Sequence, residues 1–318
     1  MPRIDAYRVR LTEYCEMLVN TGRSQATQTK YFEVLRRLRT VARSMGITHS
    51  PGRWTIEDVG KVLQSRTIKM DGTRMANASQ LLEATVLRQF LSYCGNPVLD
   101  NALRTKQYRL PPRTRQYARW PTIDQIITLR VSARANSPPG TYLMVVLAFE
   151  ALLRRKEIAY LEISDIRETH ILVHGKGEKY REVYLTHRTR TEIWDYVENV
   201  RPMITKGEDS PLLLVHRAPG YVKGFVPDAI TERIANAGRT ATPPFRCSPH
   251  DLRRSGARTI YLADPSERTL SKLQDALGHS TIDQTRSYIG IGLIDQEGAF
   301  HARDRYLAKM YPEAFSQG

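Results

Sequence analysis

The stretch LGHSTIDQTRSYI, residues 277–289, shows the pattern of short helices joined by tight turns on which the fold prediction rests. Gly278 is placed to end one helix, because glycine readily adopts the left-handed conformation that closes helices. Ser280 or Thr281 can cap the next helix, which would carry Tyr288 near its end. A single tyrosine at such a position is typical of half-buried packing. The stretch therefore predicts two helices joined by a turn and leaves the role of Tyr288 open.

A further helix start lies upstream, in the stretch SPHDLRR at residues 248–254. On a helix that begins near Pro249, His250 and Arg253 are three residues apart and share a face. Two potential cations repel each other unless an anion lies between them, and the guanidinium fork of Arg253 fits phosphate oxygens. The same residues are equally compatible with an ordinary helix start that carries incidental polar side chains.

Two more basic positions precede these segments. Arg154 follows the apolar residues 142–153 and stands three residues before Glu157, so a simple ion pair on a helix surface would explain both side chains. Lys176 lies between two glycines in residues 171–185, whose β-rich runs predict a hairpin. A lysine in a turn is usually solvated, but flanking glycines let the backbone bring its ammonium group close to another molecule.

The pattern elsewhere predicts a mainly α protein with a small β-hairpin or sheet in its C-terminal domain. Apolar residues at helical spacing indicate an all-helical domain over residues 1–107, with stripes that begin at Tyr7, at Tyr31 (running to Met45), at Val59 behind the cap Thr55, and at Leu82 before Gly95. Residues 108–120 are basic, contain two prolines and lack an apolar stripe, which is typical of a linker.

A second domain is expected over residues 121–318. Thr122 and Gln125 form a capping-box pattern for a helix over residues 122–133. A longer helix is predicted over residues 139–160, followed by the hairpin and then mostly by helices. The last of these is expected to be amphipathic and to cover residues 303–311.

Positive charge is concentrated in the first third of the chain. The 318 residues carry 48 Lys and Arg against 33 Asp and Glu, a net charge of +15; residues 1–119 hold 21 of these bases and 9 of the acids. Such a concentration favours a nucleic-acid partner over a generally basic, solvated surface. The arginines that we expect to contact DNA are Arg36, Arg37, Arg39 and Arg43 on a helix, and Arg113, Arg115 and Arg119 in the linker.

Other classes of protein are not favoured. The longest apolar run, residues 142–153, contains Glu150 and is too short to span a bilayer, and the charged N-terminus has no segment typical of a signal peptide. Cys15, Cys94 and Cys247 lie far apart, without the spacing of a disulfide framework or a zinc site. No carboxylate cluster, P-loop or HExxH motif predicts a metal. We expect a cytoplasmic protein without metal ion, cofactor or membrane partner.

In this chain order the four segments resemble the catalytic domain of the tyrosine recombinase, or phage integrase, family, with features of its Cre-like and Xer-like members. The resemblance covers residues 120–300, and residues 1–105 are similar to the core-binding domain that precedes it in this family. It rests on Arg154 with Glu157, Lys176 between glycines, His250-Asp-Leu-Arg253, Leu-Gly-His279-Ser, and Tyr288 nine residues beyond that histidine.

The resemblance implies a homotetramer that cuts and rejoins double-stranded DNA at a specific site, without a metal ion, through a 3′-phosphotyrosyl intermediate. The tyrosine would be the nucleophile, the two arginines would clamp the phosphate, the histidines would donate hydrogen bonds or take the phenol proton, and the lysine would protonate the departing 5′ oxygen. The implied catalytic set is Arg154, Lys176, His250, Arg253, His279 and Tyr288, supported by Glu157. A C-terminal tail that packs into a neighbouring subunit is also implied; the alternative is that the tail folds back on its own domain.

Two positions depart from the family pattern, and two other functions remain open. Leu152 stands where many relatives have Gly, which we expect to alter packing only. Arg254 stands where Xer-type enzymes have His, which adds a cation whose orientation the sequence does not disclose. A type IB topoisomerase shares the same chemistry but acts as a monomer. A catalytically silent DNA-binding regulator would have no physical need for the clustered cations.

Overall fold

The chain divides into two compact units, residues 1–116 and 117–318, which are described separately. The computed structural model describes the following stretches of the chain: 5–68, 72–112, 120–175 and 180–310. Within these stretches, no helix is both long enough and apolar enough to cross a membrane.

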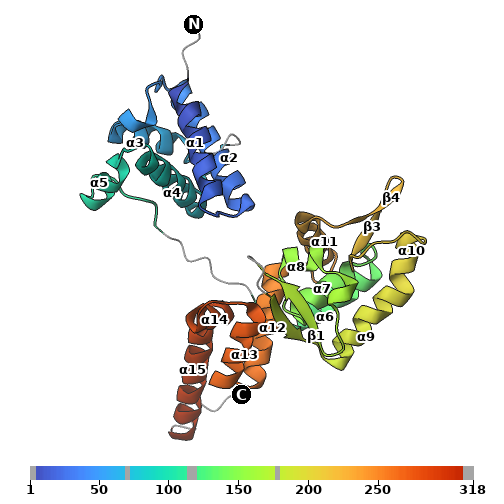
Figure 1. Cartoon of the computed structure of the whole chain (residues 1–318). Helices are drawn as coiled ribbons and strands as arrows, with labels where there is room; N and C mark the ends of the chain where they lie inside the picture. The colour runs from blue at the N-terminus through green and yellow to red at the C-terminus, as the bar shows by residue number, and fades with distance from the viewer. Residues whose placement is uncertain (1–4, 69–71, 113–119, 176–179, 311–318) are drawn as a thin grey trace. The chain divides into compact units, whose positions relative to one another are not determined.

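The first unit is a bundle of helices (Figure 1). Its elements are α1 (Ala6–Asn20), α2 (Gln25–Ser44), a short 3₁₀ turn (Pro51–Arg53), α3 (Ile56–Ser65), α4 (Asn77–Tyr93) and α5 (Val98–Arg104). The predicted stripes meet in one core, in which Leu35, Leu38 and Phe90 are fully buried. Met45 is exposed, although the stripe included it, because α2 ends one residue earlier. Thr55 caps α3 as predicted, through a capping box with Asp58.

The second unit is also mainly helical, with two short antiparallel hairpins, so the predicted fold class is confirmed. Its elements are α6 (Ile123–Ala135), α7 (Thr141–Phe149), α8 (Arg155–Tyr160), a 3₁₀ turn (Ile163–Asp165), β1 (His170–His174), β2 (Tyr180–Tyr184), α9 (His187–Asp195), a π-helical turn (Tyr196–Val200), α10 (Arg201–Thr205), β3 (Val215–Ala218), β4 (Tyr221–Gly224), α11 (Pro227–Arg239), α12 (Pro249–Ala263), α13 (Glu267–Leu277), α14 (Ile282–Ile289) and α15 (Ile291–Met310).

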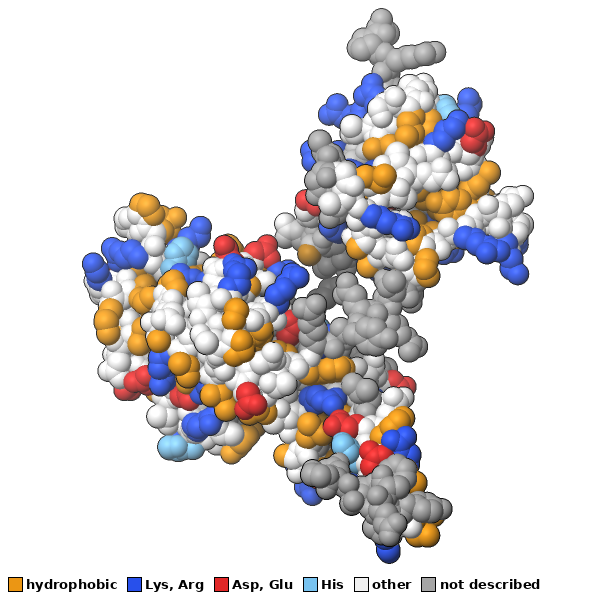
Figure 2. All heavy atoms as spheres, turned by 180° about the vertical axis from the view of Figure 1, so that it is seen from behind, with side chains coloured by type: hydrophobic (Ala, Val, Ile, Leu, Met, Phe, Trp, Pro, Cys, Tyr) orange, Lys and Arg blue, Asp and Glu red, His pale blue; other side chains and the backbone are white. Residues whose placement is uncertain are grey.

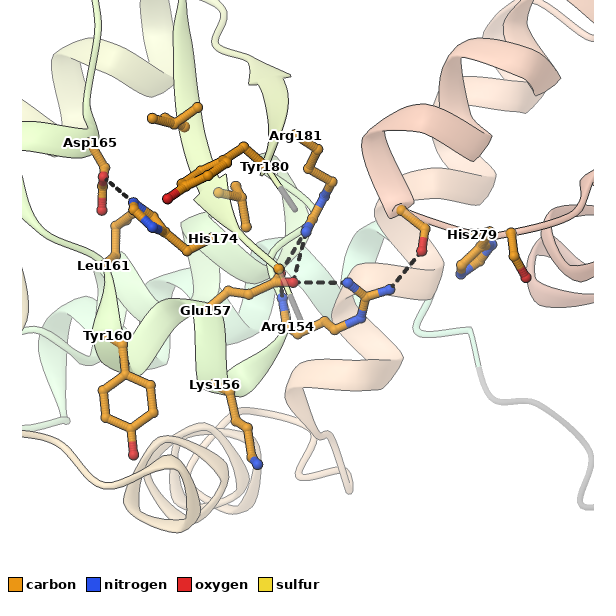
Figure 3. A pocket seen from close by; sticks show the side chains of 15 residues that line it. Arg154, Lys156, Glu157, Tyr160, Leu161, Asp165, His174, Tyr180, Arg181 and His279 are labelled. Atoms are coloured by element: carbon orange, nitrogen blue, oxygen red, sulfur yellow. Dashed lines mark hydrogen bonds and ion pairs between the residues drawn. The ribbon is translucent and has the colours of Figure 1, made fainter. Parts of the chain in front are cut away.

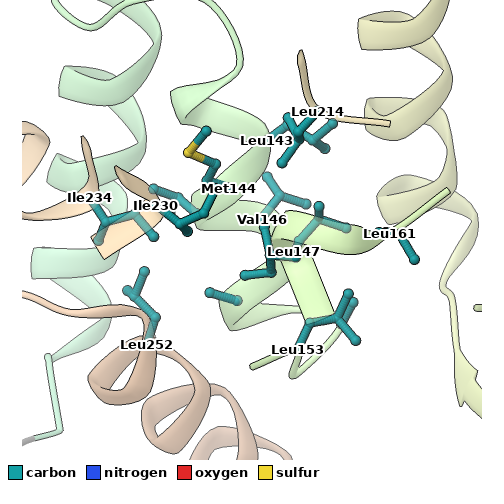
Figure 4. Packing of buried hydrophobic residues seen from close by; sticks show 14 of the residues in the cluster. Leu143, Met144, Val146, Leu147, Leu153, Leu161, Leu214, Ile230, Ile234 and Leu252 are labelled. Atoms are coloured by element: carbon teal, nitrogen blue, oxygen red, sulfur yellow. The ribbon is translucent and has the colours of Figure 1, made fainter. Parts of the chain in front are cut away.

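The core of the second unit is built around α7, which is apolar on every side. Its residues from Leu143 to Ala148 are all buried, which is typical of a helix enclosed by other elements. Helices α6, α11 and α12 pack on it, and Figure 4 shows Leu252 of α12 and Ile230 and Ile234 of α11 around Met144 and its neighbours. Helix α7 thus positions two segments that carry polar motifs: α8, which follows it along the chain, and α12, which packs on it.

The prediction of one helix over residues 139–160 is wrong. Helix α7 ends at Phe149 and α8 begins only at Arg155. Between them Leu152 is buried and has a φ of +52°, in the left-handed region that favours glycine. Leu152 therefore affects the backbone as well as the packing, beyond the effect on packing alone that was expected. The apolar pattern gave no clear signal for the break, because Ala151, Leu152 and Leu153 continue the apolar run of the helix before them.

The C-terminal end also differs from the prediction. Helix α15 starts at Ile291, well before residue 303, and the glycine cap Gly290 (φ +73°) is all that separates it from α14. A Cβ at Gly290 would lie 2.6 Å from Cζ2 of Trp120, so this close approach requires glycine.

The β3–β4 hairpin was also not predicted from the sequence pattern. The predicted caps Thr122, Gly278 and Thr281 are confirmed.

Candidate active site

Arg154 stands at the start of α8 because the chain breaks just before it. Its backbone N–H donates to Oε2 of Glu157 at 2.7 Å, and its Nη1 donates to Oε1 of the same carboxylate at 2.8 Å. The ion pair expected from the sequence is therefore present. It is only part of a larger arrangement, however, because two more arginines reach the same carboxylate.

Glu157 is the common partner of three guanidinium groups. Arg181 of β2 donates to both carboxylate oxygens, at 2.8 and 2.7 Å, and Nη1 of Arg253 lies 3.4 Å from Oε2. Figure 3 shows Arg154 and Arg181 converging on Glu157 from different elements. Burial alone would raise the pKa of Glu157, but the hydrogen bonds and charges of Arg181 and Arg154 lower it to about 2. Glu157 is therefore ionised at any physiological pH.

The same arginines are also bound to the C-terminal end of α13. The carbonyl oxygen of Leu277 accepts from Nη2 of Arg253 at 2.5 Å and from Nη2 of Arg154 at 2.7 Å, and that of Ala276 accepts from Nε of Arg181 at 2.8 Å. The last carbonyls of a helix lack intrahelical partners and carry the negative end of its dipole, so cations are stabilised there. This helix end and Glu157 together hold the three guanidinium groups in place.

Tyr288 of α14 lies beside two histidines. Its hydroxyl is 3.4 Å from Nδ1 of His250, which stands in the first turn of α12 behind the cap Ser248. The rings of His250 and His279 both meet the tyrosine ring edge-on, with centroids 5.2 and 5.0 Å apart. His279 is fixed by a 3.0 Å hydrogen bond between its Nδ1 and Oγ1 of the buried Thr285.

One cavity of about 530 Å³ brings these groups together. Its lining includes Arg154, Lys156, Ser248, His250, Arg253, His279 and Tyr288. A second cavity, of about 820 Å³, shares some of this lining and extends beneath β1 and β2 (Figure 3). The first cavity is thus lined by a phenol, two imidazoles and three guanidinium groups, those of Arg154, Arg155 and Arg253, a set of side chains that can bind and attack a phosphodiester.

The protonation states of the tyrosine and the histidines follow from burial and from the arginines. Burial raises the pKa of Tyr288, while the charges of Arg253 and Arg254 oppose that rise. Desolvation and the neighbouring arginine charges lower the pKa of His250, and the same causes lower that of His279 to about 4. At neutral pH the phenol is therefore protonated and both imidazoles are neutral.

The comparison with known proteins identifies the family. The family model described as the phage integrase family matches residues 123–291, slightly more than half of the chain. The chain belongs to the phage integrase family. The tyrosine recombinase XerC of Lactobacillus delbrueckii subsp. bulgaricus is 29% identical over 155 residues, which cover 47% of this chain and 50% of that protein. The XerC of Alcanivorax borkumensis is 25% identical over 216 residues, 64% of this chain and 66% of that one.

This member of the phage integrase family thus spans about half the length of the first curated relative described above, and about two thirds of the second. A solved structure, that of a lambda integrase dimer bound to a COC′ core site, matches 89% of this chain and 76% of that chain with a TM-score of 0.65 and 14% identity. At this level of identity the likeness concerns the fold.

Most of the expected catalytic set of this family member lies in one place. Arg154, His250, Arg253, His279 and Tyr288 line one cavity, with Glu157 behind the arginines. Lys176 falls in residues 176–179, outside the described part of the chain. Arg181 was not among the site residues predicted from the sequence. Its signal was the strand alternation of β2, in which it shares the inward face with Val183.

The arginines expected to contact DNA have different surroundings. Arg36 and Arg37 are exposed on α2, whereas Arg39 is bound to Asp5 and Nη1 of Arg43 lies 3.4 Å from the same carboxylate. Figure 2 shows Lys and Arg side chains in separate patches over the visible face of the first unit. The three linker positions Arg113, Arg115 and Arg119 lie outside the described residues.

A Glu157→Gln substitution is expected to lower the free energy of unfolding of the second unit by about 3 kcal/mol, because removing one partner leaves buried charges uncompensated. The side chain of Glu157 is 9% exposed and that of Arg253 is 2% exposed. Urea unfolding monitored by circular dichroism measures the effect. The exposed Glu198→Gln is the matched control, and an equally small change in both variants would contradict the role of Glu157.

Acidification from pH 7 to 5 is expected to destabilise the second unit through His279. Its pKa is about 4 in the folded protein against 6.5 for an unperturbed histidine, so the unfolded chain binds the proton first and the free energy of unfolding falls with the pH. We expect a loss of about 1 kcal/mol, because solvent reaches part of the ring. His279→Gln should flatten this pH dependence, whereas the exposed His301→Gln should leave it as in the wild type. A wild-type slope in His279→Gln would contradict the assignment.

Proposed function

We propose that this chain is a site-specific DNA recombinase that cuts and rejoins DNA strands through a covalent bond to Tyr288. One observation carries the proposal: the tyrosine hydroxyl lies 3.4 Å from Nδ1 of His250, in a cavity also lined by His279 and by two arginines fixed in advance. A tyrosine that served only to pack in the core would not require neighbouring imidazoles and fixed guanidinium groups. The related proteins named tyrosine recombinase XerC support the same chemistry.

The proposed reaction exchanges one phosphate ester for another. The oxygen of Tyr288 attacks the scissile phosphorus while the bond to the 5′ oxygen breaks, which leaves a 3′-phosphotyrosyl ester and a 5′-hydroxyl. The phenol proton passes to His250, which can accept it because it is neutral, and Lys176 protonates the leaving oxygen. The attack of a 5′-hydroxyl from another strand reverses these steps. Since the two esters are similar in energy, the cycle needs no nucleotide hydrolysis.

Arg154 and Arg253 supply the fixed positive charge for this reaction. Their guanidinium groups face the cavity while Glu157 and the carbonyl of Leu277 hold them. In the transition state extra negative charge develops on the nonbridging phosphate oxygens, and preorganised donors stabilise that charge most effectively. His279 adds a further hydrogen-bond donor at the rim.

We further propose that residues 1–107 form a core-binding domain on duplex DNA, that residues 108–120 are a basic linker, and that residues 121–318 form the catalytic domain. The protein would act on DNA in the cytoplasm of a prokaryotic or virus-infected cell, as a homotetramer on its recombination site. Helix α15 supports this assembly, because it exposes Phe300, Tyr306 and Met310, apolar side chains that a neighbouring subunit could cover.

The test is to trap the intermediate. The full-length protein is incubated with a library of nicked duplexes that lose the 5′-hydroxyl fragment once cut, and the DNA ends that remain attached are sequenced. A recombinase gives a 3′-linked adduct on one sequence, with Tyr288 as the modified residue in mass spectrometry. Relaxation of supercoiled plasmids of any sequence would instead indicate a topoisomerase. DNA binding without an adduct would indicate a silent regulator.

A further inference from the structure

Arg254 lies against the face of the Tyr288 ring. Its guanidinium carbon is 5.1 Å from the ring centroid, within the range of a cation–π interaction. Arg253, its neighbour on α12, turns instead to Glu157 and to the carbonyl of Leu277. Consecutive helical residues point about 100° apart, so Arg254 does not share the Glu157 and Leu277 partners of Arg253. The orientation of Arg254, which the sequence does not disclose, is thus toward the tyrosine.

The ring is the one strong partner of Arg254 in the described part of the chain. There its side chain forms no ion pair or hydrogen bond, and its Nε is buried without an acceptor. A buried donor without a partner costs free energy, and the negative face of an aromatic ring offsets part of that cost. Arg254 does not line the cavity that contains His250, Arg253 and Tyr288.

Arg254 forms no ion pair in the described part of the chain, in contrast to Arg154 and Arg253. The titratable or charged groups near the phenol are His250, Arg253 and Arg254 on α12, His279 before α14, and Arg154, Arg155 and Lys156 at the start of α8. Glu157 offsets the charges of Arg154 and Arg253, and the two histidines are neutral at pH 7. Arg254 therefore acts on the phenol with a charge that is not held in an ion pair in the described part of the chain.

We propose that Arg254 is a positioning residue for Tyr288, which holds the ring between the two histidines and stabilises the phenolate that forms as the tyrosine attacks. A cation over the ring attracts the neutral phenol through its quadrupole and attracts the phenolate more strongly, through its full charge. The effect is therefore larger in the transition state than in the ground state, as catalysis requires. The proposal rests on the proposed role of Tyr288 as nucleophile.

The first test measures the ionisation of the Tyr288 phenol directly, in the full-length protein without DNA. Tyrosines are replaced by 3,5-difluorotyrosine, whose phenol is more acidic, and the ¹⁹F signal of position 288 is assigned by its absence in Tyr288→Phe. Arg254→Met is expected to raise the titration midpoint of this signal by about one pH unit. Arg254→Lys keeps the charge and should restore most of the shift. The exposed Arg268→Met on α13 removes a charge elsewhere and should leave the midpoint unchanged.

The second test measures the rate of adduct formation on a nicked duplex between pH 6 and 10. Arg254→Met should lower the rate at pH 7 about tenfold and move the rise of the profile to higher pH, with DNA affinity unchanged. An unchanged titration midpoint in Arg254→Met overturns the proposal. A rate of adduct formation that falls only in proportion to DNA affinity also overturns it, and would show that Arg254 binds a DNA phosphate. If the wild type forms no adduct, the proposed function fails, and the midpoint still decides whether Arg254 acts on the phenol.

Discussion

A Tyr288→Phe variant is expected to bind duplex DNA as well as the wild type and to form no covalent adduct with it. The phenylalanine ring keeps the edge-on contacts with His250 and His279 and the position over which Arg254 lies. The substitution removes the hydroxyl, which lies 3.4 Å from Nδ1 of His250 and also interacts with Arg253. Loss of the nucleophile is absolute, whereas the change in stability should stay within about 1 kcal/mol.

The measurement is denaturing electrophoresis of the protein after incubation with the nicked duplex, beside a binding assay on the same preparation. Tyr261→Phe is a matched control, because Tyr261 is partly buried in the same small hydrophobic cluster, the one that contains Tyr288 and Leu273. It should form the adduct at the wild-type rate. An adduct in Tyr288→Phe would show that another residue attacks the phosphate, and the assignment of Tyr288 would be wrong.

A Gly256→Ala substitution is expected to destabilise the second unit strongly. Gly256 is where α12 crosses the end of α7, and an added Cβ would lie far inside the contact distance of the carbonyl oxygen of Phe149 and 2.9 Å from Cδ2 of Leu152. Backbone atoms cannot rotate away as a side-chain tip can, so the two helices must separate. We expect the free energy of unfolding to fall by about 3 kcal/mol, at the upper end of the cost of overpacking.

Gly298→Ala is the control for this prediction. Gly298 lies within α15, and a Cβ there would meet no atom within 4 Å. Alanine should stabilise that helix by up to about 1 kcal/mol, since glycine is the poorer helix former. Thermal unfolding of the two variants should therefore shift in opposite directions. Equal shifts would mean that the close approach of α12 and α7 does not limit stability.

The local signals in the sequence proved informative wherever the chemistry is local. Thr122 and Thr281 cap helices, and Gly278 ends one, because a side-chain oxygen or a left-handed glycine acts on backbone groups within a few residues. Helical spacing located the core of the first unit for the same reason. These predictions required no knowledge of distant contacts.

The features that the sequence did not disclose depend on distant parts of the chain. The break before Arg154 puts Leu152 in a conformation that leucine disfavours locally, and packing against α12 holds it there. The roles of Arg181 and Arg254 depend on Glu157 and on Tyr288, which are far away in sequence. Glu157 was expected as a helix-surface partner of one arginine, and its place among three depends on the fold, which brings Arg181 of β2 and Arg253 of α12 to the same carboxylate.

Arg154 and Arg253 both donate a hydrogen bond to the carbonyl of Leu277, and this arrangement affects the rate of the proposed reaction. Long flexible side chains normally surrender their rotational freedom when a ligand arrives, and that loss weakens binding. Here the folding of the chain has already immobilised both guanidinium forks against a helix end. An incoming phosphodiester would therefore meet a rigid receptor, and the strength of its electrostatic interactions would be available for bond cleavage instead of for ordering the site.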